Sequence, residues 1–143
     1  MLFRSSAPAK DANGNSLGNL PCVKPPWERL FAVNANTGDI AWQVPLGITE
    51  GLPEAKQHTG RSGAFAGPIA TAGGLVFIGA TSDSRFRAFD SKTGKELWTT
   101  KLDYSATAVP ISYQGKSGKQ YVAVVAAGGG RGNNQSLIVF ALP

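Results

Sequence analysis

The chain has 143 residues, of which 42% are hydrophobic and 16% are charged, and its formal net charge is +5. This hydrophobic content excludes a largely disordered protein, and the length corresponds to about one domain. The 14 Lys and Arg residues are scattered rather than gathered in one run, so we expect no nucleic-acid partner.

Residues 1–26 form the first segment, which is rich in Ser, Ala, Asn, Gly and Pro and shows no hydrophobic periodicity. We predict an irregular loop segment here. The start of the chain lacks the apolar run of a signal peptide, and no stretch reaches the roughly 18 apolar residues of a membrane span. The sequence therefore predicts either a cytoplasmic protein or a targeting segment on a longer parent chain.

The stretch 32–42 has a near copy at 88–98, in which Ala, Asp or Asn, Thr, Gly and Trp recur in the same order. Gly38 and Gly94 would supply the positive φ of a tight turn between two antiparallel strands. The Trp of each copy follows four residues later, where its ring can bury area between neighbouring sheets. A repeat with this displacement is typical of solenoids and propellers.

Beyond residue 26, short apolar segments separated by turn residues predict nine strands. These strands are 29–34, 40–44, 67–72, 75–80, 85–90, 96–102, 107–114, 120–127 and 136–142. They group into the last two strands of one sheet, a complete four-stranded sheet and three strands of another. We therefore predict that residues 27–143 are all-β and form about two and a quarter four-stranded antiparallel blades of a β-propeller. So few blades cannot close a ring, and we expect a C-terminal part of a larger propeller.

The connection 45–66 has no helix or strand period, and long connections of this kind are often functional. It contains His58, the only histidine. Both a solvated side chain and a ligand-binding role stay open for His58, and the solvated one is commoner for a histidine in a polar loop.

The repeated motif resembles the tryptophan-docking motif of quinoprotein dehydrogenases, which are eight-bladed propellers that use pyrroloquinoline quinone (PQQ). Further runs resemble the membrane-type glucose dehydrogenase branch, namely 21–27, 40–47, 72–81, 85–98 and 118–129. The resemblance implies oxidation of a sugar or an alcohol, with a Ca²⁺ ion beside the PQQ and a quinone or cytochrome as electron acceptor. It also implies a periplasmic location, in a parent protein that an inner-membrane anchor would hold.

The same resemblance indicates that the Gly-rich loop 127–134 approaches the cofactor. Gly128, Gly129 and Gly130 would let backbone N–H groups approach an anion, and Arg131 would pair with a carboxylate of the quinone. A surface hairpin with a solvated Arg131 is the alternative.

No residue matches the catalytic Asp, the metal ligands or the vicinal cysteines of the family. The aspartates of this chain occupy motif or turn positions, which indicates structural roles for Asp39, Asp83, Asp90 and Asp103. We therefore predict no catalytic or metal-binding residue in this chain. We expect the chain to be inactive without the remaining propeller blades.

A second function stays open, that of a non-catalytic scaffold similar to the bacterial outer-membrane assembly lipoprotein. That protein also uses Asp-x-x-Thr-Gly turns followed by Trp. Scaffold propellers are expected to have tighter loops between blades, so the connection 45–66 and the loop 127–134 favour the dehydrogenase.

Overall fold

The computed structural model describes residues 5–61, 63, 66–128 and 134–141, and nearly all regular structure within them is β. The elements are β1 (Ser6–Lys10), β2 (Ser16–Pro21), β3 (Arg29–Val33), β4 (Ile40–Pro45), the 3-10 turn η1 (Glu54–Lys56), β5 (Ile69–Ala70), β6 (Leu75–Ile78), β7 (Arg85–Asp90), β8 (Glu96–Lys101), β9 (Ser105–Ala106), β10 (Ile111–Gln114), β11 (Gln120–Ala127) and β12 (Gln135–Ala141). No helix within the described ranges is long and apolar enough to cross a bilayer.

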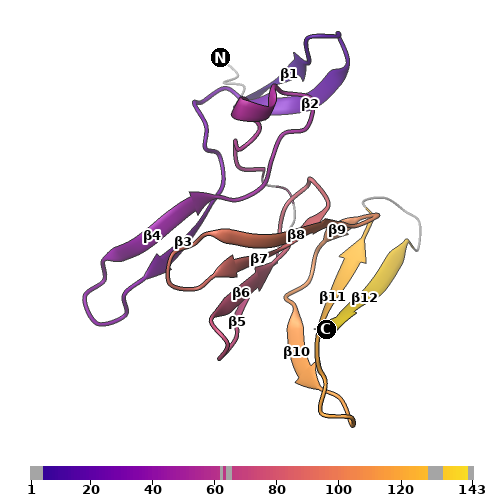
Figure 1. The fold of residues 1–143 in the computed structure, drawn as a ribbon. Helices are drawn as coiled ribbons and strands as arrows, with labels where there is room; N and C mark the ends of the chain where they lie inside the picture. The colour runs from indigo at the N-terminus through magenta and orange to yellow at the C-terminus, as the bar shows by residue number, and fades with distance from the viewer. Residues whose placement is uncertain (1–4, 62, 64–65, 129–133, 142–143) are drawn as a thin grey trace.

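Three antiparallel sheets follow one another along the chain beyond β2 (Figure 1). The first is β3–β4, the middle sheet is β5–β6–β7–β8, and the last is β10–β11–β12 with β9 also paired to β11. This grouping confirms the predicted all-β blades. The predicted strand 107–114 is too long, because only β10 at 111–114 is a strand within that range. Pro110, which has no N–H to donate, lies just before it, and β9 pairs separately with β11 further upstream.

The prediction of irregular structure for residues 1–26 is wrong for much of that segment, since β1 and β2 form an antiparallel hairpin. Asp11 organises the turn: its Oδ1 accepts the N–H groups of Asn13 and Asn15, each at 2.8 Å. Gly14 completes the turn with φ of 85°. The strands are mostly polar or small and include Pro8, so no hydrophobic alternation marked them.

The two copies of the repeat have the same backbone register. Ala32 lies opposite Trp42 on β3 and β4, and Ala88 lies opposite Trp98 on β7 and β8. In both hairpins the register shifts immediately after the alanine. The similarity of the sequences therefore extends to the position of a β-bulge.

Trp42 joins the first sheet to the middle sheet. Its indole N–H donates to the backbone oxygen of Ser91 at 2.9 Å, in the turn between β7 and β8. The ring also covers Gly94, where an added Cβ would lie 2.5 Å from the nearest ring carbon. Gly94 thus meets two constraints, a φ of 71° and the close approach of an aromatic ring.

The central strands of the middle sheet, β6 and β7, are covered on both faces. One face packs Phe77, Phe86 and Ala88 against residues of the last sheet, including Val122 and Val124. On the opposite face a second cluster brings together Leu46, Ile78, Ala80 and Phe89, with Leu30 and Val44 of the first sheet packed against it. This arrangement explains why β6 has no polar face in the sequence.

The outward faces of the first and last sheets remain apolar and exposed. Phe31 on β3 is 57% exposed and Ile40 on β4 is 58% exposed, while Leu137 on β12 is 68% exposed. Exposed apolar faces of this kind mark contact surfaces.

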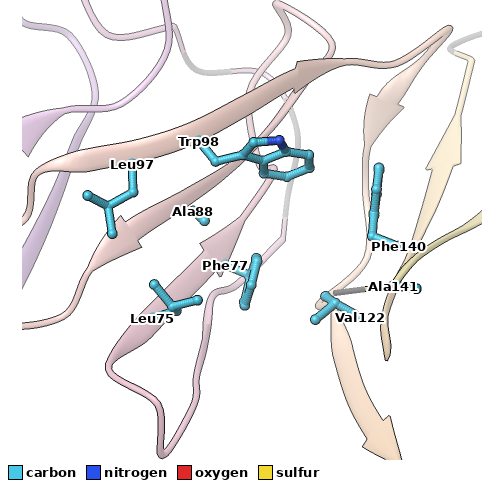
Figure 2. A pocket seen from close by; sticks show the side chains of 8 residues that line it. All are labelled: Leu75, Phe77, Ala88, Leu97, Trp98, Val122, Phe140 and Ala141. Atoms are coloured by element: carbon cyan, nitrogen blue, oxygen red, sulfur yellow. The ribbon is translucent and has the colours of Figure 1, made fainter. Parts of the chain in front are cut away.

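An apolar pocket of about 430 Å³ opens between the middle and last sheets (Figure 2). Trp98 borders it, with its ring edge-on to Phe140 at a centroid distance of 5.2 Å. Trp98 therefore packs on a neighbouring sheet through an aromatic side chain, whereas Trp42 packs on a glycine turn.

We expect Gly94→Ala to destabilise the chain more than Gly38→Ala. Both glycines have positive φ, which costs an alanine about 1–2 kcal/mol. Only Gly94 faces Trp42, and overpacking there adds about 1–3 kcal/mol; nothing lies within 4 Å of a Cβ at Gly38. Urea denaturation of both variants measures the difference, and equal losses would show that the Trp42 contact contributes no stability.

Candidate functional site

In an antiparallel sheet, successive connections alternate between the two ends of the strands. One end carries the turns of the repeat, at 34–39 and 91–95, and the opposite end carries the connections that follow β4, β6 and β11 (Figure 1). We call this second side the loop edge. Binding residues are commonly placed on loops that a rigid scaffold holds, so the loop edge is the candidate site.

The connection 46–61 is closed on itself by hydrogen bonds, although most of it has no regular structure. The Arg61 N–H donates to the Leu46 carbonyl oxygen at 2.7 Å, which brings the ends of the segment together. Inside it, the hydroxyls of Thr49 and Thr59 are 2.7 Å apart and both residues are buried. The segment is therefore a compact loop that holds Arg61 in a defined place.

A buried ion pair lies beneath this loop. Arg87 projects from β7 and is 1% exposed, and its guanidinium binds the carboxylate of Asp83. Asp83 also accepts a hydrogen bond from the Thr81 hydroxyl at 2.6 Å and one from the backbone N–H of Ile48 at 2.8 Å. The Nε of Arg87 lies 3.3 Å from Glu96 Oε2. Asp83 thus joins the turn between β6 and β7 to the loop above it, as expected of a residue with a structural role.

Burial alone would raise the pKa of the Asp83 carboxyl. The hydrogen bonds and charge of Arg87, with the hydrogen bonds from Thr81 and Ile48, outweigh it and hold the pKa below its ordinary value. The flanking residues Ala80 and Ser84 both have positive φ, at 57° and 55°. Two non-glycine residues in this region indicate that the surrounding contacts fix the turn against its local preference.

A small polar pocket of about 210 Å³ lies on the loop edge, next to β2. We call it the loop-edge pocket, and its lining residues are Ser16, Leu17, Ile48, Glu50, Arg61, Ser82 and Asp83. The Arg61 Nε–H donates to Ser82 Oγ at 3.2 Å, and its Nη2 donates to the Leu17 carbonyl oxygen at 3.4 Å. Arg61 therefore connects the β1–β2 hairpin to the turn between β6 and β7.

Glu50 has two cationic partners at the pocket rim. Arg85 Nη1 lies 2.6 Å from Glu50 Oε1, and Lys101 Nζ lies 3.0 Å from Glu50 Oε2. The hydrogen bonds from Arg85 and then from Lys101 are the main reasons why the pKa of Glu50 is lowered. Because Glu50 is about half exposed, these pairs add little stability.

Among the predicted cofactor-binding residues, only Gly128 can be placed. Its N–H donates to the Asn134 carbonyl oxygen at 2.9 Å, and an added Cβ would lie 2.8 Å from the ring of Tyr104. Gly129, Gly130 and Arg131 lie outside the described residues. His58 is exposed on the loop 46–61.

No group of three or more His, Cys, Asp or Glu side chains in the described part of the chain is arranged to hold a metal ion.

The sequence did not single out Arg61, Arg87 or Glu50. A signal existed for Arg87, since it is a charge between Phe86 and Ala88 in the middle of the strand β7. Arg61 gave no such signal, because its surroundings depend on contacts with Leu17 and Ser82, far away in the sequence.

Comparison with known families gives a match to the model described as "PQQ: Glucose/ethanol/alcohol dehydrogenase, beta-propeller domain" over residues 4–122. Quinate/shikimate dehydrogenase (quinone) of Acinetobacter baylyi is 44% identical over 78% of this chain and 14% of its own length. Quinoprotein glucose dehydrogenase A of Acinetobacter calcoaceticus is 36% identical over 87% of this chain and 16% of its own length. The chain thus spans about one sixth of these relatives or less.

Several solved structures are similar to this chain. A europium-containing methanol dehydrogenase superposes with a TM-score of 0.52 at 37% identity, over 69% of this chain and 15% of that one. BamB from Moraxella catarrhalis superposes with a TM-score of 0.52 at 19% identity, over 95% of this chain and 40% of that one. The second likeness is one of fold alone.

We expect Asp83→Asn to lower the free energy of unfolding by about 3 kcal/mol, because it leaves the buried Arg87 without its main counterion. The matched control is Glu50→Gln, which removes a carboxylate from exposed pairs and should cost about 0–1 kcal/mol. Urea denaturation at neutral pH measures both. A loss at Asp83 no larger than that at Glu50 would contradict the assigned role.

The same pair gives the wild type a pH dependence. The lowered pKa of Asp83 means that its contribution is fully present above the unfolded value of about 3.9 and is lost as the pH falls through the folded pKa. The unfolding free energy of the wild type should therefore fall below about pH 4 more steeply than that of Asp83→Asn.

Proposed function

Because this chain belongs to the PQQ-dependent glucose/ethanol/alcohol dehydrogenase β-propeller family, we propose that it is the C-terminal part of a dehydrogenase that oxidises a hydroxyl group of a sugar or another alcohol. The observation that carries the proposal is the family match over residues 4–122. The relatives at 44% and 36% identity support two substrate classes, cyclic hydroxy acids such as quinate and sugars such as glucose. Electrons would pass to a quinone or a cytochrome, and the location would be periplasmic.

The family depends on PQQ, which when bound takes up the electrons released from the alcohol. We assign Gly128, Gly129, Gly130 and Arg131 to its approach, as the loop sequence suggests. The close contact with Tyr104 leaves no room for a side chain at Gly128. A Ca²⁺ ion or a related metal would take its ligands from other blades.

Other blades of the same propeller are the partners that fit the outward faces of the first and last sheets. Large apolar side chains are exposed on both faces, namely Phe31, Val33 and Ile40 on the first sheet and Leu137 and Val139 on the last.

Residues 27–143 would contribute the blades, and the hairpin within residues 1–26 would cover part of the loop edge. Trp42 and Trp98 would then act as tryptophan-docking residues between neighbouring blades.

The scaffold alternative depends on fold, and a likeness to BamB at 19% identity does not carry function. The family match and the relatives at 36% to 44% identity favour the dehydrogenase. The polar loop edge is consistent with that choice, because Arg61 and the buried Asp83–Arg87 pair lie there rather than among the repeat turns.

The test is a chimera in which this chain replaces the matching 14% of the Acinetobacter baylyi quinate/shikimate dehydrogenase. We expect the chimera to bind PQQ and to oxidise quinate with a dye as electron acceptor, while the chain alone shows no turnover with PQQ and Ca²⁺. A chimera that folds but binds no PQQ would contradict the proposal. Robust turnover by the chain alone would contradict its being only a part of the catalytic unit.

Arg131→Gln in the chimera tests the cofactor assignment. Loss of a charge-assisted hydrogen bond to a carboxylate should weaken PQQ binding about 10-fold to 100-fold. The control is Lys116→Gln, a change in the turn between β10 and β11 at the opposite edge of the sheet. Equal PQQ affinity in both variants and in the parent chimera would remove Arg131 from the cofactor site.

A further inference from the structure

We propose that Arg61 in the loop-edge pocket binds the carboxylate of a small hydroxylated acid. The inference deepens the proposed function, since it selects acidic substrates over neutral sugars, and it rests on that function for the identity of the ligand. The pocket lies on the same edge of the sheets as the loop that begins at Gly128.

The carboxylates that line the loop-edge pocket are paired with other cations, and Arg61 is not part of these pairs. Both oxygens of Asp83 are engaged, by Arg87 and by the hydrogen bonds from Thr81 and Ile48. Both oxygens of Glu50 are likewise paired with cations. Arg61 forms no ion pair with any described residue. Each carboxylate that lines the pocket therefore has its own counterion, and the guanidinium of Arg61 is the charge that a ligand would neutralise.

The contacts of Arg61 leave part of its guanidinium available to a ligand. A guanidinium has five N–H donors in a rigid fork, and the structure uses one on Ser82 and one on the Leu17 carbonyl oxygen. These two contacts fix the plane of the group while leaving other donors available. A carboxylate matches such a fork with two parallel hydrogen bonds, and a neutral hydroxyl does not.

The size and lining of the pocket limit the ligand. The volume of about 210 Å³ is below the roughly 300–1,000 Å³ of pockets that hold drug-sized ligands. Ser16 and Ser82 add hydroxyl groups to the wall. The pocket therefore suits a compact acid with several hydroxyls, on one ring or a short chain.

The first experiment measures binding in the 143-residue chain and in the chimera. Quinate is titrated while amide NMR shifts near Ile48 and Ser82 are followed, and its uncharged methyl ester is the matched ligand. We expect Arg61→Gln to weaken quinate binding about 10-fold to 100-fold and to leave ester binding within about two-fold. Arg61→Lys should recover part of the affinity, because it restores the charge without the fork.

Lys56→Gln is the control, since it removes an exposed cation from the same loop outside the pocket. It should leave quinate affinity unchanged. An equal loss in the control would show that only the net charge of the loop matters and would overturn the proposal. Equal weakening of quinate and ester by Arg61→Gln would also overturn it, because Arg61 would then only join Leu17 to Ser82.

Kinetics of the chimera separate the two possible carboxylates, that of the substrate and those of PQQ. We expect Arg61→Gln to raise KM for quinate with little change in kcat and no change in PQQ affinity. A fall in PQQ affinity instead would assign Arg61 to the cofactor and overturn the proposal. Quinate binding needs no turnover, so an inactive chimera that still binds quinate through Arg61 would defeat the proposed function and leave this inference standing.

Discussion

The burial of the strand β7 on both faces is the constraint on which the rest of the structure depends. A strand covered on two sides has no solvent face for a charge, yet β7 carries Arg87 at its centre. The charge is tolerated because Asp83 is held within reach by the turn between β6 and β7. The same carboxylate accepts the Ile48 N–H, so the neutralisation of one buried arginine also fixes the position of the loop above it.

The opposite edge of the sheets is organised by a different contact. Trp42 donates to the Ser91 carbonyl oxygen and covers Gly94, so a hairpin of one sheet is held by the turn of the next. The shared register of Trp42 and Trp98, each opposite an alanine, places both rings on the face that meets the following sheet. One edge is therefore occupied by repeated turns, which leaves the other edge free to differ from blade to blade.

Much of the fold could be predicted from the sequence, because the blades depend on local patterns. Gly38 and Gly94 mark the turns, and apolar runs such as β6 mark strands covered on both sides. The β1–β2 hairpin could not be predicted, since an Asp11-centred turn joins strands that have no hydrophobic alternation. The candidate site could not be predicted either, because Arg61 contacts segments that are distant from it in the sequence.

The loop edge then follows from how each of its charges is compensated. Arg87 and Asp83 neutralise one another below the surface, and Glu50 is shared by Arg85 and Lys101 at the rim. Structural charges in a folded chain are paired because an unpaired one costs free energy when it is partly desolvated. Arg61 is held by two neutral acceptors instead, in a loop closed by its own backbone. A cation that is positioned without being neutralised has the electrostatic character of a binding residue, which is why the acidic ligand is assigned to Arg61 and not to the buried, paired Arg87.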